Sequence, residues 1–359
     1  MNEVDLKDKS IRFSDVSILS AYDVDINLLA DFYNNNPLDN SSLVKHWEWK
    51  FRTSSFANKI PLVMVYNGRI IAHVGLVPFE VFLCGKKHTA AWMTDLSILP
   101  EFRSRGAGMG RRLIALTKKW MEFSDLNLAI GNDYAINFLN HFGWIESFDT
   151  YIHRFLLLPF NRPALTSPIH KFSCNVLKNI SRNILKVVYK KYAASIKELY
   201  MYGLNQNIIN EFLNMLYEPD KGVMPSRDID YANWRLLCSP DKEKYRMVTI
   251  EGNDVKIIIK LIDDKPYKHI EILWMTGQSN LASVKEAIST LAVWGIKNSY
   301  SMIRYYTSHK IVSDYLKKSL KSVVDHPRFS FYSKDNTLLQ KATNTIWHWQ
   351  LIDSDFETF

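Results

Sequence analysis

Hydrophobic and polar positions in the first part of the chain follow two periods, one of about 3.6 residues and one of two. Apolar residues at helical spacing predict helices over 25–35, 110–123 and 133–142. Alternating or continuous apolar runs predict strands over 11–19, 61–66, 69–83, 89–99, 126–131 and 144–158. Asn67-Gly68 joins two of these runs, and Asn-Gly tolerates the positive φ angles of a tight hairpin. This order predicts an α/β fold with a mixed sheet, in which an antiparallel meander meets one parallel strand–helix–strand crossover.

The C-terminal part of the chain repeats this order in outline. Strands are predicted over 245–252, 254–263, 269–276, 299–307, 329–333 and 345–352, and helices over 281–296 and 309–321. YANWRLL (231–237) also echoes HWEWKF (46–51). We therefore expect two tandem domains of one fold, over 1–157 and 201–359.

Residues 158–200 follow neither pattern and are expected to join the two domains. FNRPALTSPIH (160–170) carries two prolines and no periodicity, which is typical of a linker. The next segment, 175–199, predicts an amphipathic helix with a basic face. The basic residues recur four apart, at Lys178, Arg182, Lys186 and Lys190. One interpretation is a solvated helix face, and the other is contact of 171–197 with a membrane surface or an anionic glycan lipid.

Composition narrows the class of protein but not its chemistry. The 359 residues are 47% hydrophobic and 23% charged, which is typical of a soluble globular protein of about two domains. The first residues form no signal peptide, and Cys84, Cys174 and Cys238 lie far apart. These features predict free thiols in a reducing cytoplasm. The net charge of +8 suits an anionic ligand such as a phosphorylated cofactor, and equally nucleic acid or an acidic membrane.

The segment ILPEFRSRGAGMGRR (98–112) combines glycine and arginine at the start of a predicted helix. Its glycines are Gly106, Gly108 and Gly110, and its arginines are Arg103, Arg105, Arg111 and Arg112. Neither a GxxxxGK[ST] loop nor a complete GxGxxG fingerprint is present. A loop without side chains that leads into a helix N-terminus still offers unpaired amides and the positive end of the helix dipole. The segment therefore predicts a phosphate site.

Two segments resemble the conserved motifs of the GNAT acyltransferases. The first is LSILPEFRSRGAGMGRRLI, where Arg103, Gly106 and Gly108 match the pattern Arg/Gln-x-x-Gly-x-Gly/Ala after Pro100. The second is GNDYAINFLNHFGWI, whose matching positions are Asn132, Ala135, Phe138, Gly143 and Trp144. TGQSNLAS (276–283) stands at the corresponding step of the second domain without that loop. We therefore expect the second domain to be a degenerate GNAT-like domain.

The resemblance implies acetyl-CoA, or another acyl-CoA, as the co-substrate, and no metal. Its pyrophosphate is expected on the amides of Arg103, Ser104, Arg105, Gly106, Ala107, Gly108 and Met109. Its pantetheine arm is expected to extend along the backbone of Leu96, Ser97 and Ile98. Asn132 and Phe138 complete the expected cofactor contacts.

The resemblance also implies direct attack of an amine on the thioester in a ternary complex. Asp95 is the first candidate to take the proton of the amine, although it could instead only bind the amine or a neighbouring strand. Glu80, acting through water, is the second candidate. A backbone N–H near Ile98 is expected to hold the carbonyl oxygen.

The general acid that protonates the leaving thiolate is the point at which the chain departs from the family pattern. Many family members carry a tyrosine one residue after the position of Phe138, where this chain has Leu139. Tyr134, His141 or a water molecule is the candidate replacement.

Among families with tandem GNAT domains, the chain is most similar to enzymes of bacterial surface-polysaccharide clusters. The similarity lies in HWEWKF, Phe142-Gly143-Trp144 and the ending WHWQLIDSDF. It implies N-acetylation of an amino sugar, either nucleotide-linked or on a glycan intermediate, and no nucleic-acid partner. Candidate acceptor contacts are Trp47, Trp49, Asp353 and Asp355, with core tryptophans and a solvated acidic tail as the alternatives. Other hypotheses are a Fem-type aminoacyl transferase and a non-catalytic CoA-binding protein.

Overall fold

The computed structural model divides the chain into two compact units. The first comprises 1–146 and 329–344, and the second comprises 147–328 and 345–359. The structure describes residues 15–20, 22–34, 43–52, 61–103, 121–131, 133–147, 150–157, 183, 186–187, 189–190, 197–215, 222–263 and 268–350. The mixed α/β class predicted from the sequence is confirmed in both units.

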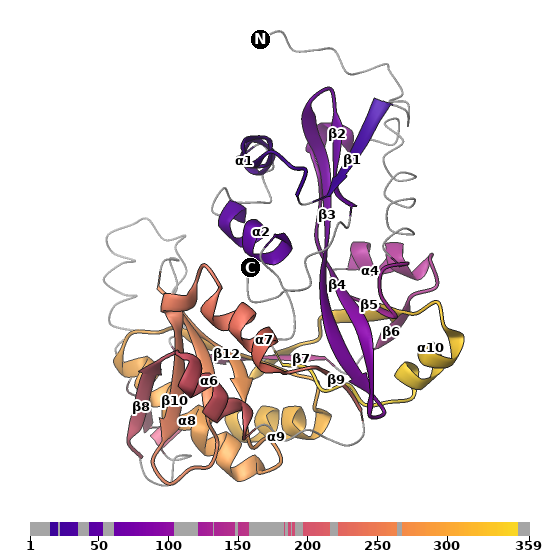
Figure 1. The fold of residues 1–359 in the computed structure, drawn as a ribbon. Helices are drawn as coiled ribbons and strands as arrows, with labels where there is room; N and C mark the ends of the chain where they lie inside the picture. The colour runs from indigo at the N-terminus through magenta and orange to yellow at the C-terminus, as the bar shows by residue number, and fades with distance from the viewer. Residues whose placement is uncertain are drawn as a thin grey trace, which may run out of the picture. The chain divides into compact units, whose positions relative to one another are not determined.

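The first unit is built on one mixed sheet with strand order β1-β2-β3-β4-β5-β15-β6. These strands are β1 (Val16–Ser20), β2 (Pro61–Tyr66), β3 (Arg69–Leu83), β4 (Lys86–Ile98), β5 (Leu126–Gly131), β6 (Ile145–Ser147) and β15 (Arg328–Tyr332). Strands β1 to β4 pair antiparallel, whereas β4 and β5 pair parallel. Figure 1 shows β3 and β4 as a long twisted hairpin.

Tight turns connect β2, β3 and β4. Asn67 and Gly68 have φ angles of 50° and 72°, so the predicted Asn-Gly hairpin is confirmed. Cys84 and Gly85 make the second turn with φ angles of 51° and 75°. Two turns of this kind fix the register of the meander, and with it the position of β4 beside β5.

Four helices of the first unit are described: α1 (Ile26–Asn34), α2 (Leu43–Phe51), α4 (Asp133–Asn140) and α10 (Asn336–Thr343). Helix α1 buries Leu29, Phe32 and Tyr33, as its helical spacing of apolar residues predicts. Both α1 and α2 contact β3. Helix α4 contributes Ile136 and Leu139 to a separate buried cluster.

The second unit holds a seven-stranded mixed sheet with strand order β14-β7-β13-β12-β11-β10-β8. These strands are β7 (Tyr151–Leu156), β8 (Leu199–Gly203), β10 (Tyr245–Ile250), β11 (Ile257–Ile262), β12 (His269–Met275), β13 (Met302–Thr307) and β14 (Val323–Asp325). The described helices are α6 (Gln206–Leu213), α7 (Ile229–Ala232), α8 (Leu281–Lys297) and α9 (Lys310–Leu320), and β9 (Val223–Pro225) is a further short strand.

One hydrophobic core unites α8 and α9 with a face of this second sheet. Ile259, Ile270 and Ile272 from the sheet pack with Ile288 of α8 and Leu316 of α9, and all five are fully buried. Burial of one such side chain contributes roughly 1.5–3 kcal/mol, so this face carries much of the stability of the unit.

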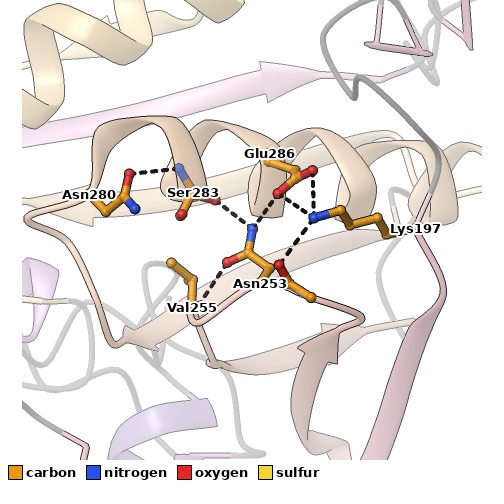
Figure 2. A network of polar contacts seen from close by, with 7 residues as sticks. Lys197, Asn253, Val255, Asn280, Ser283 and Glu286 are labelled. Carbon is orange, nitrogen blue, oxygen red and sulfur yellow. Dashed lines mark hydrogen bonds and ion pairs between the residues drawn. The ribbon is translucent and has the colours of Figure 1, made fainter.

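A polar network fixes α8 to the turn between β10 and β11 (Figure 2). Lys197 Nζ lies 3.1 Å from Glu286 Oε1, and Asn253 Nδ2 donates to Glu286 Oε2 at 2.8 Å. Asn253 also donates to the carbonyl of Ser283 and accepts from Val255 N. The first turns of α8 are thereby held in place by side chains from two other segments.

The structure corrects the predicted use of three segments. The expected single strand 144–158 is two strands, and the second, β7, pairs with β13 in the sheet of the second unit. Residues 329–333 were expected in the second sheet, but β15 belongs to the first. The expected strand 345–352 shows only isolated bridges at Trp347 and Gln350 within its described part. Local patterns identify strands but do not show which sheet a strand joins.

Several predicted segments lie outside the described residues. They include most of the helix expected at 110–123 and the linker at 160–170. Within the basic segment 171–197, the described positions 183, 186–187 and 189–190 are helical. In the part of the chain that the structure describes, no helix has the length and apolar composition needed to cross a bilayer.

Candidate functional site

A β-bulge interrupts β4 at the segment expected to contact the acyl donor. On either side of it, Ser97 pairs with His73 and Thr94 pairs with Gly75. Two residues of β4 therefore face one residue of β3, Val74. The two bulged residues are Asp95 and Leu96. A bulge leaves backbone groups outside the regular ladder and is common beside active sites. It therefore provides backbone groups at the place where the sequence predicts the acyl carbonyl to bind.

The parallel strands β4 and β5 separate at the same place. Their pairing runs from Ala90–Leu126 to Met93–Ala129, while β4 continues to Ile98 and β5 to Gly131. Beyond Met93, no further β4–β5 pair is found among the described residues. We call the place where β4 continues beyond this pairing the wedge, and its β4 side is Thr94 to Ile98. An extended ligand arm can pair with such an edge as an added strand.

Arg103, the first arginine of the motif, is held at the end of this wedge. A 3₁₀ turn at Pro100–Phe102 follows β4, and Phe102 is buried. The Nε of Arg103 donates to the carbonyl of Ile98 at 2.7 Å, and Arg103 is an exposed residue. The other motif residues, from Ser104 to Gly110, lie outside the described residues.

Helix α2 packs against β3 beside the bulge, and the sequence did not predict this contact. Trp47 Nε1 donates to His73 Nε2 at 2.7 Å, and the histidine is 1% exposed. The ring of Phe51 covers Gly75 so closely that a Cβ there would lie 2.2 Å from it. Trp47 and Phe51 are four residues apart in HWEWKF, and this spacing was the available signal. His73 and Gly75 pair with the residues on either side of the bulge, so contacts from α2 stabilise β3 at this point.

The two candidate carboxylates occupy different parts of the hairpin. Asp95 lies in the bulge itself. Glu80 pairs with Thr89, five residues further along β3 than Gly75, which is about 17 Å along the strand. Glu80 also forms an ion pair with Lys87. The structure therefore brings Asp95, but not Glu80, to the wedge.

Helix α4 follows β5 and carries the other candidates. Leu139, at the position of the family tyrosine, is 1% exposed and belongs to the buried cluster with Ile136 and Trp144. His141 is exposed just after the helix, and Phe138 packs on Phe142 with ring centroids 5.1 Å apart. Asn132 and the side chain of Tyr134 lie outside the described part of the structure.

Of the four candidate acceptor contacts, two are buried tryptophans and two are aspartates outside the described residues. Trp47 and Trp49 are 1% and 3% exposed, so both indoles are core side chains. Four other tryptophans, Trp92, Trp274, Trp347 and Trp349, are also buried. Asp353 and Asp355 lie outside the described residues. Among the described residues, no group of three His, Cys, Asp or Glu side chains gathers to hold a metal ion.

The second unit contains a parallel pair of the same design. Strands β12 and β13 pair from His269–Met302 to Ile272–Tyr305, and β12 then continues to Met275. A register shift against β11 leaves Leu273 as an extra residue in β12. This bulge follows the last parallel pair, as the bulge in β4 does. In this wedge, however, Met275 N donates to Gln350 Oε1 at 2.6 Å, and Gln350 Nε2 donates to Met275 O.

Comparisons with known proteins agree with this geometry. Residues 26–144 match the model of the acetyltransferase (GNAT) family. Saccharomyces cerevisiae N-myristoyltransferase with bound myristoyl-CoA is 11% identical, with a TM-score of 0.55 over 91% of this chain and 80% of that one. A probable N-acyltransferase from Enterococcus faecalis V583 is 11% identical, with a TM-score of 0.51 over 91% and 73%. A GCN5-related N-acetyltransferase from Anabaena variabilis is also 11% identical, with a TM-score of 0.51 over 88% and 71%. No curated protein matches the chain in sequence.

The match of residues 26–144 to the acetyltransferase (GNAT) family supports the class that the sequence predicts, an acyl-CoA-dependent N-acyltransferase. The reaction class is acyl transfer from acyl-CoA to an amine, and the thioester supplies the activated acyl group. The match to the acetyltransferase (GNAT) family covers residues 26–144 of the 359. At these low identities the solved structures show the fold, and the family match adds the reaction class.

Proposed function

We propose that the protein transfers an acetyl group from acetyl-CoA to the primary amine of an amino sugar, nucleotide-linked or on a glycan intermediate. The single observation that carries the acyl-transfer part is the bulge at Asp95–Leu96, at the point where β4 leaves β5. The amino sugar is supported by the similarity of HWEWKF and the C-terminal WHWQLIDSDF to enzymes of surface-polysaccharide clusters.

The residues at the wedge have distinct proposed roles. Asp95 takes the proton of the acceptor ammonium, which makes its nitrogen nucleophilic. A backbone N–H near Ile98 donates to the carbonyl oxygen as negative charge develops on it. Arg103 and the amides that follow it, through Met109, bind the pyrophosphate, with Asn132 and Phe138 as further contacts. The nitrogen–carbon bond forms as the carbon–sulfur bond breaks, and the thiolate takes up a proton.

Leu139 leaves the source of that last proton open, with Tyr134, His141 or water as candidates. His141 is exposed at the end of α4, as a group that exchanges protons with solvent should be. If His141 is the acid, His141→Gln lowers kcat. An unchanged kcat assigns the role to Tyr134 or water.

Release of free CoA thiol provides the direct test of the acceptor. The purified full chain is incubated with acetyl-CoA and each of three acceptor classes: amino-sugar nucleotides, aminoglycosides and peptides with a free N-terminus. We expect turnover with at least one amino-sugar nucleotide. Turnover only with aminoglycosides or peptides would contradict the amino sugar, and the acyl-transfer class would remain.

Two alternatives are separated by the donor. The likeness to a structure with bound myristoyl-CoA concerns the fold and does not identify the acyl group. Acetyl-CoA and myristoyl-CoA are therefore compared as donors in the same assay. A non-catalytic CoA-binding protein, which the buried Leu139 favours, predicts binding of CoA by calorimetry without turnover on any amine. A Fem-type aminoacyl transferase predicts activity with charged tRNA and none with acetyl-CoA.

A further inference from the structure

Two aromatic side chains of helix α2 contact the stretch of β3 that lies opposite the bulge. Trp47 Nε1 donates to His73 Nε2 at 2.7 Å, and both residues are 1% exposed. Phe51, one turn further along the helix, lies against Gly75. His73 and Gly75 are the residues of β3 whose partners flank the bulge in β4. Helix α2 therefore contacts β3 at both flanks of the bulge.

The three rings of this contact form one buried cluster. Ring centroids are 5.5 Å apart between Trp47 and Phe51, 5.5 Å between Phe51 and His73, and 6.2 Å between Trp47 and His73. Tilted and edge-to-face arrangements at these distances are the ones that aromatic pairs favour. The guanidinium of Arg52 lies 5.3 Å from the centroid of the Trp47 ring, and its Nη2 donates to the carbonyl of Val24. Packing on several sides thus fixes the direction of the indole N–H.

The hydrogen bond between Trp47 and His73 adds a direction that apolar packing does not supply. Because an indole nitrogen only donates, His73 Nε2 accepts, and the bond requires the histidine form without a proton on that atom. A buried neutral hydrogen bond contributes little net stability, and apolar groups of the same shape can replace both partners at little cost. The distinguishing effect of the bond is therefore to orient the His73 ring and the backbone that carries it.

A bulge is a place where such an orientation matters. The extra residue interrupts the ladder only locally, and a shift of the pairing by one residue would turn the neighbouring side chains to the other face. With β3 held at His73 and Gly75, the extra residue of β4 falls at Asp95–Leu96. The backbone N–H near Ile98, to which the proposed function assigns the acyl carbonyl, belongs to the same stretch of β4.

We propose that His73, held by Trp47, is a positioning residue for acyl transfer. Their hydrogen bond sets the place of the bulge in β4, and with it the backbone N–H near Ile98. His73 acts through the backbone of β3 and is not itself a catalytic residue. The inference rests on the proposed function for what the bulge does, but the state of the bulge can be measured without any acceptor. A displaced N–H weakens binding of the transition state more than binding of the donor, so kcat should fall while the KM of the donor is preserved.

Steady-state kinetics of Trp47→Phe in the full chain test this role. Phenylalanine keeps an aromatic ring beside Phe51 and removes the N–H donor. We expect kcat to fall about tenfold while the KM for acetyl-CoA stays within about threefold. Trp234→Phe is the matched control, because Trp234 is a tryptophan of the second unit that is also buried, at 4% exposed. This control should leave both constants unchanged.

Variants of His73 separate a lost hydrogen bond from a lost shape. His73→Gln can offer an amide oxygen to the indole N–H and should keep kcat within about threefold of the wild type. His73→Leu offers no acceptor and should lower kcat about as much as Trp47→Phe. The double variant Trp47→Phe/His73→Leu should be no slower than either single variant, since the same bond is lost in all three. Additive losses would indicate two independent packing effects and would overturn the proposal.

Hydrogen exchange of the backbone amides reports on the bulge without donor or acceptor. In Trp47→Phe, the amides of 93–99 should exchange several-fold faster than in the wild type, whereas in Trp234→Phe they should not. The proposal is overturned if Trp47→Phe has the exchange rates of the wild type at 93–99, or if it has the kcat of the wild type. If the wild type acetylates no amine at all, the proposed function fails, and exchange at 93–99 alone decides whether the bond sets the bulge.

Discussion

The two parallel strand pairs of this chain have the same backbone design and different contents. In each, four residue pairs are followed by a bulge and by separation of the strands, at Met93–Ala129 in one unit and at Ile272–Tyr305 in the other. The first bulge contains Asp95, and the second contains Leu273, which is fully buried. The two strand pairs thus share a backbone pattern, and the residue types at their bulges differ.

The second wedge differs from the first in the contacts that Gln350 makes there. The side-chain amide of Gln350 bonds both the N–H and the C=O of Met275, and Thr307 forms a bridge with Gln350. These are the backbone groups that an extended ligand would otherwise pair with. In the second wedge, a segment near the C-terminus therefore bonds the end of β12. The acyl-CoA arm is proposed to bind at the corresponding position of the first wedge, beside β4.

The largest expected effect comes from removing the carboxylate that distinguishes the first bulge. Asp95→Asn should lower kcat by about 100-fold or more while CoA affinity stays within a few-fold, because only proton transfer is lost. Steady-state kinetics and calorimetry with CoA measure the two quantities. Glu80→Gln is the matched control, and it should retain most activity because Glu80 pairs with Lys87 away from the wedge. Equal losses in the two variants would remove the special role of Asp95.

A second expected effect concerns the support of the first bulge. Gly75→Ala should destabilise the protein by up to about 3 kcal/mol, because the new Cβ overlaps the Phe51 ring and overpacking is costly. Urea unfolding measures the change. Gly203→Ala, where a Cβ would meet nothing within 4 Å, is the control and should change stability by less than about 0.5 kcal/mol. If the two variants are equally stable, α2 does not hold the bulge rigidly.

Acid should weaken the second unit through buried His153. Its Nδ1 and Nε2 contact Ser322 and Ser313, and burial, then the charges of His326 and Lys317, lower its pKa to about 4. Because the unfolded histidine titrates near 6.5, the unfolded state binds the proton first as pH falls. Stability is therefore complete above about pH 6.5 and declines toward pH 4, by about 2 kcal/mol between pH 7 and pH 5.

Urea unfolding of the wild type and of His153→Gln at pH 7 and pH 5 measures this contribution. The variant is expected to be less stable at pH 7 and to show a smaller pH dependence. Parallel pH dependences in the two proteins would assign the acid sensitivity to other groups, such as His309.

The smallest expected effect comes from opening the second wedge. Gln350→Ala removes both side-chain bonds to Met275 and should cost about 1 kcal/mol in urea unfolding, the usual net value of a hydrogen bond. Acetyl transfer and CoA affinity should not change, because the proposed donor site is in the other wedge. A second equivalent of CoA bound to Gln350→Ala would show instead that Gln350 alone keeps the second copy closed.

Much of the local structure could be predicted from the sequence, since it depends on short-range signals. Asn67-Gly68 identified its hairpin, and the apolar spacing of 281–296 identified α8. Strand β8 and helix α10 were missed because each lies in a short stretch of weak periodicity. The assignment of β7 and β15 to their sheets depends on contacts between residues far apart in the chain, which no local window contains.

The candidate site was predictable only in part for the same reason. Asp95 was chosen from its place before the predicted donor strand, but the bulge there depends on register against His73 and Gly75. The tryptophans of HWEWKF were candidates for sugar binding, with a place in the core as the alternative, because an aromatic residue suits both a core and a sugar face. Burial of Trp47 and Trp49 places them in the core.

The placement of β15 also has a consequence for synthesis of the protein. The sheet of the first unit lacks a strand between β5 and β6 until residues 328–332 have left the ribosome. The nascent first half therefore exposes two unpaired strand edges during the translation of more than half the chain, when edge pairing with other chains is a hazard. Expression of residues 1–157 alone should consequently give aggregated material, and co-expression of the remainder should recover it.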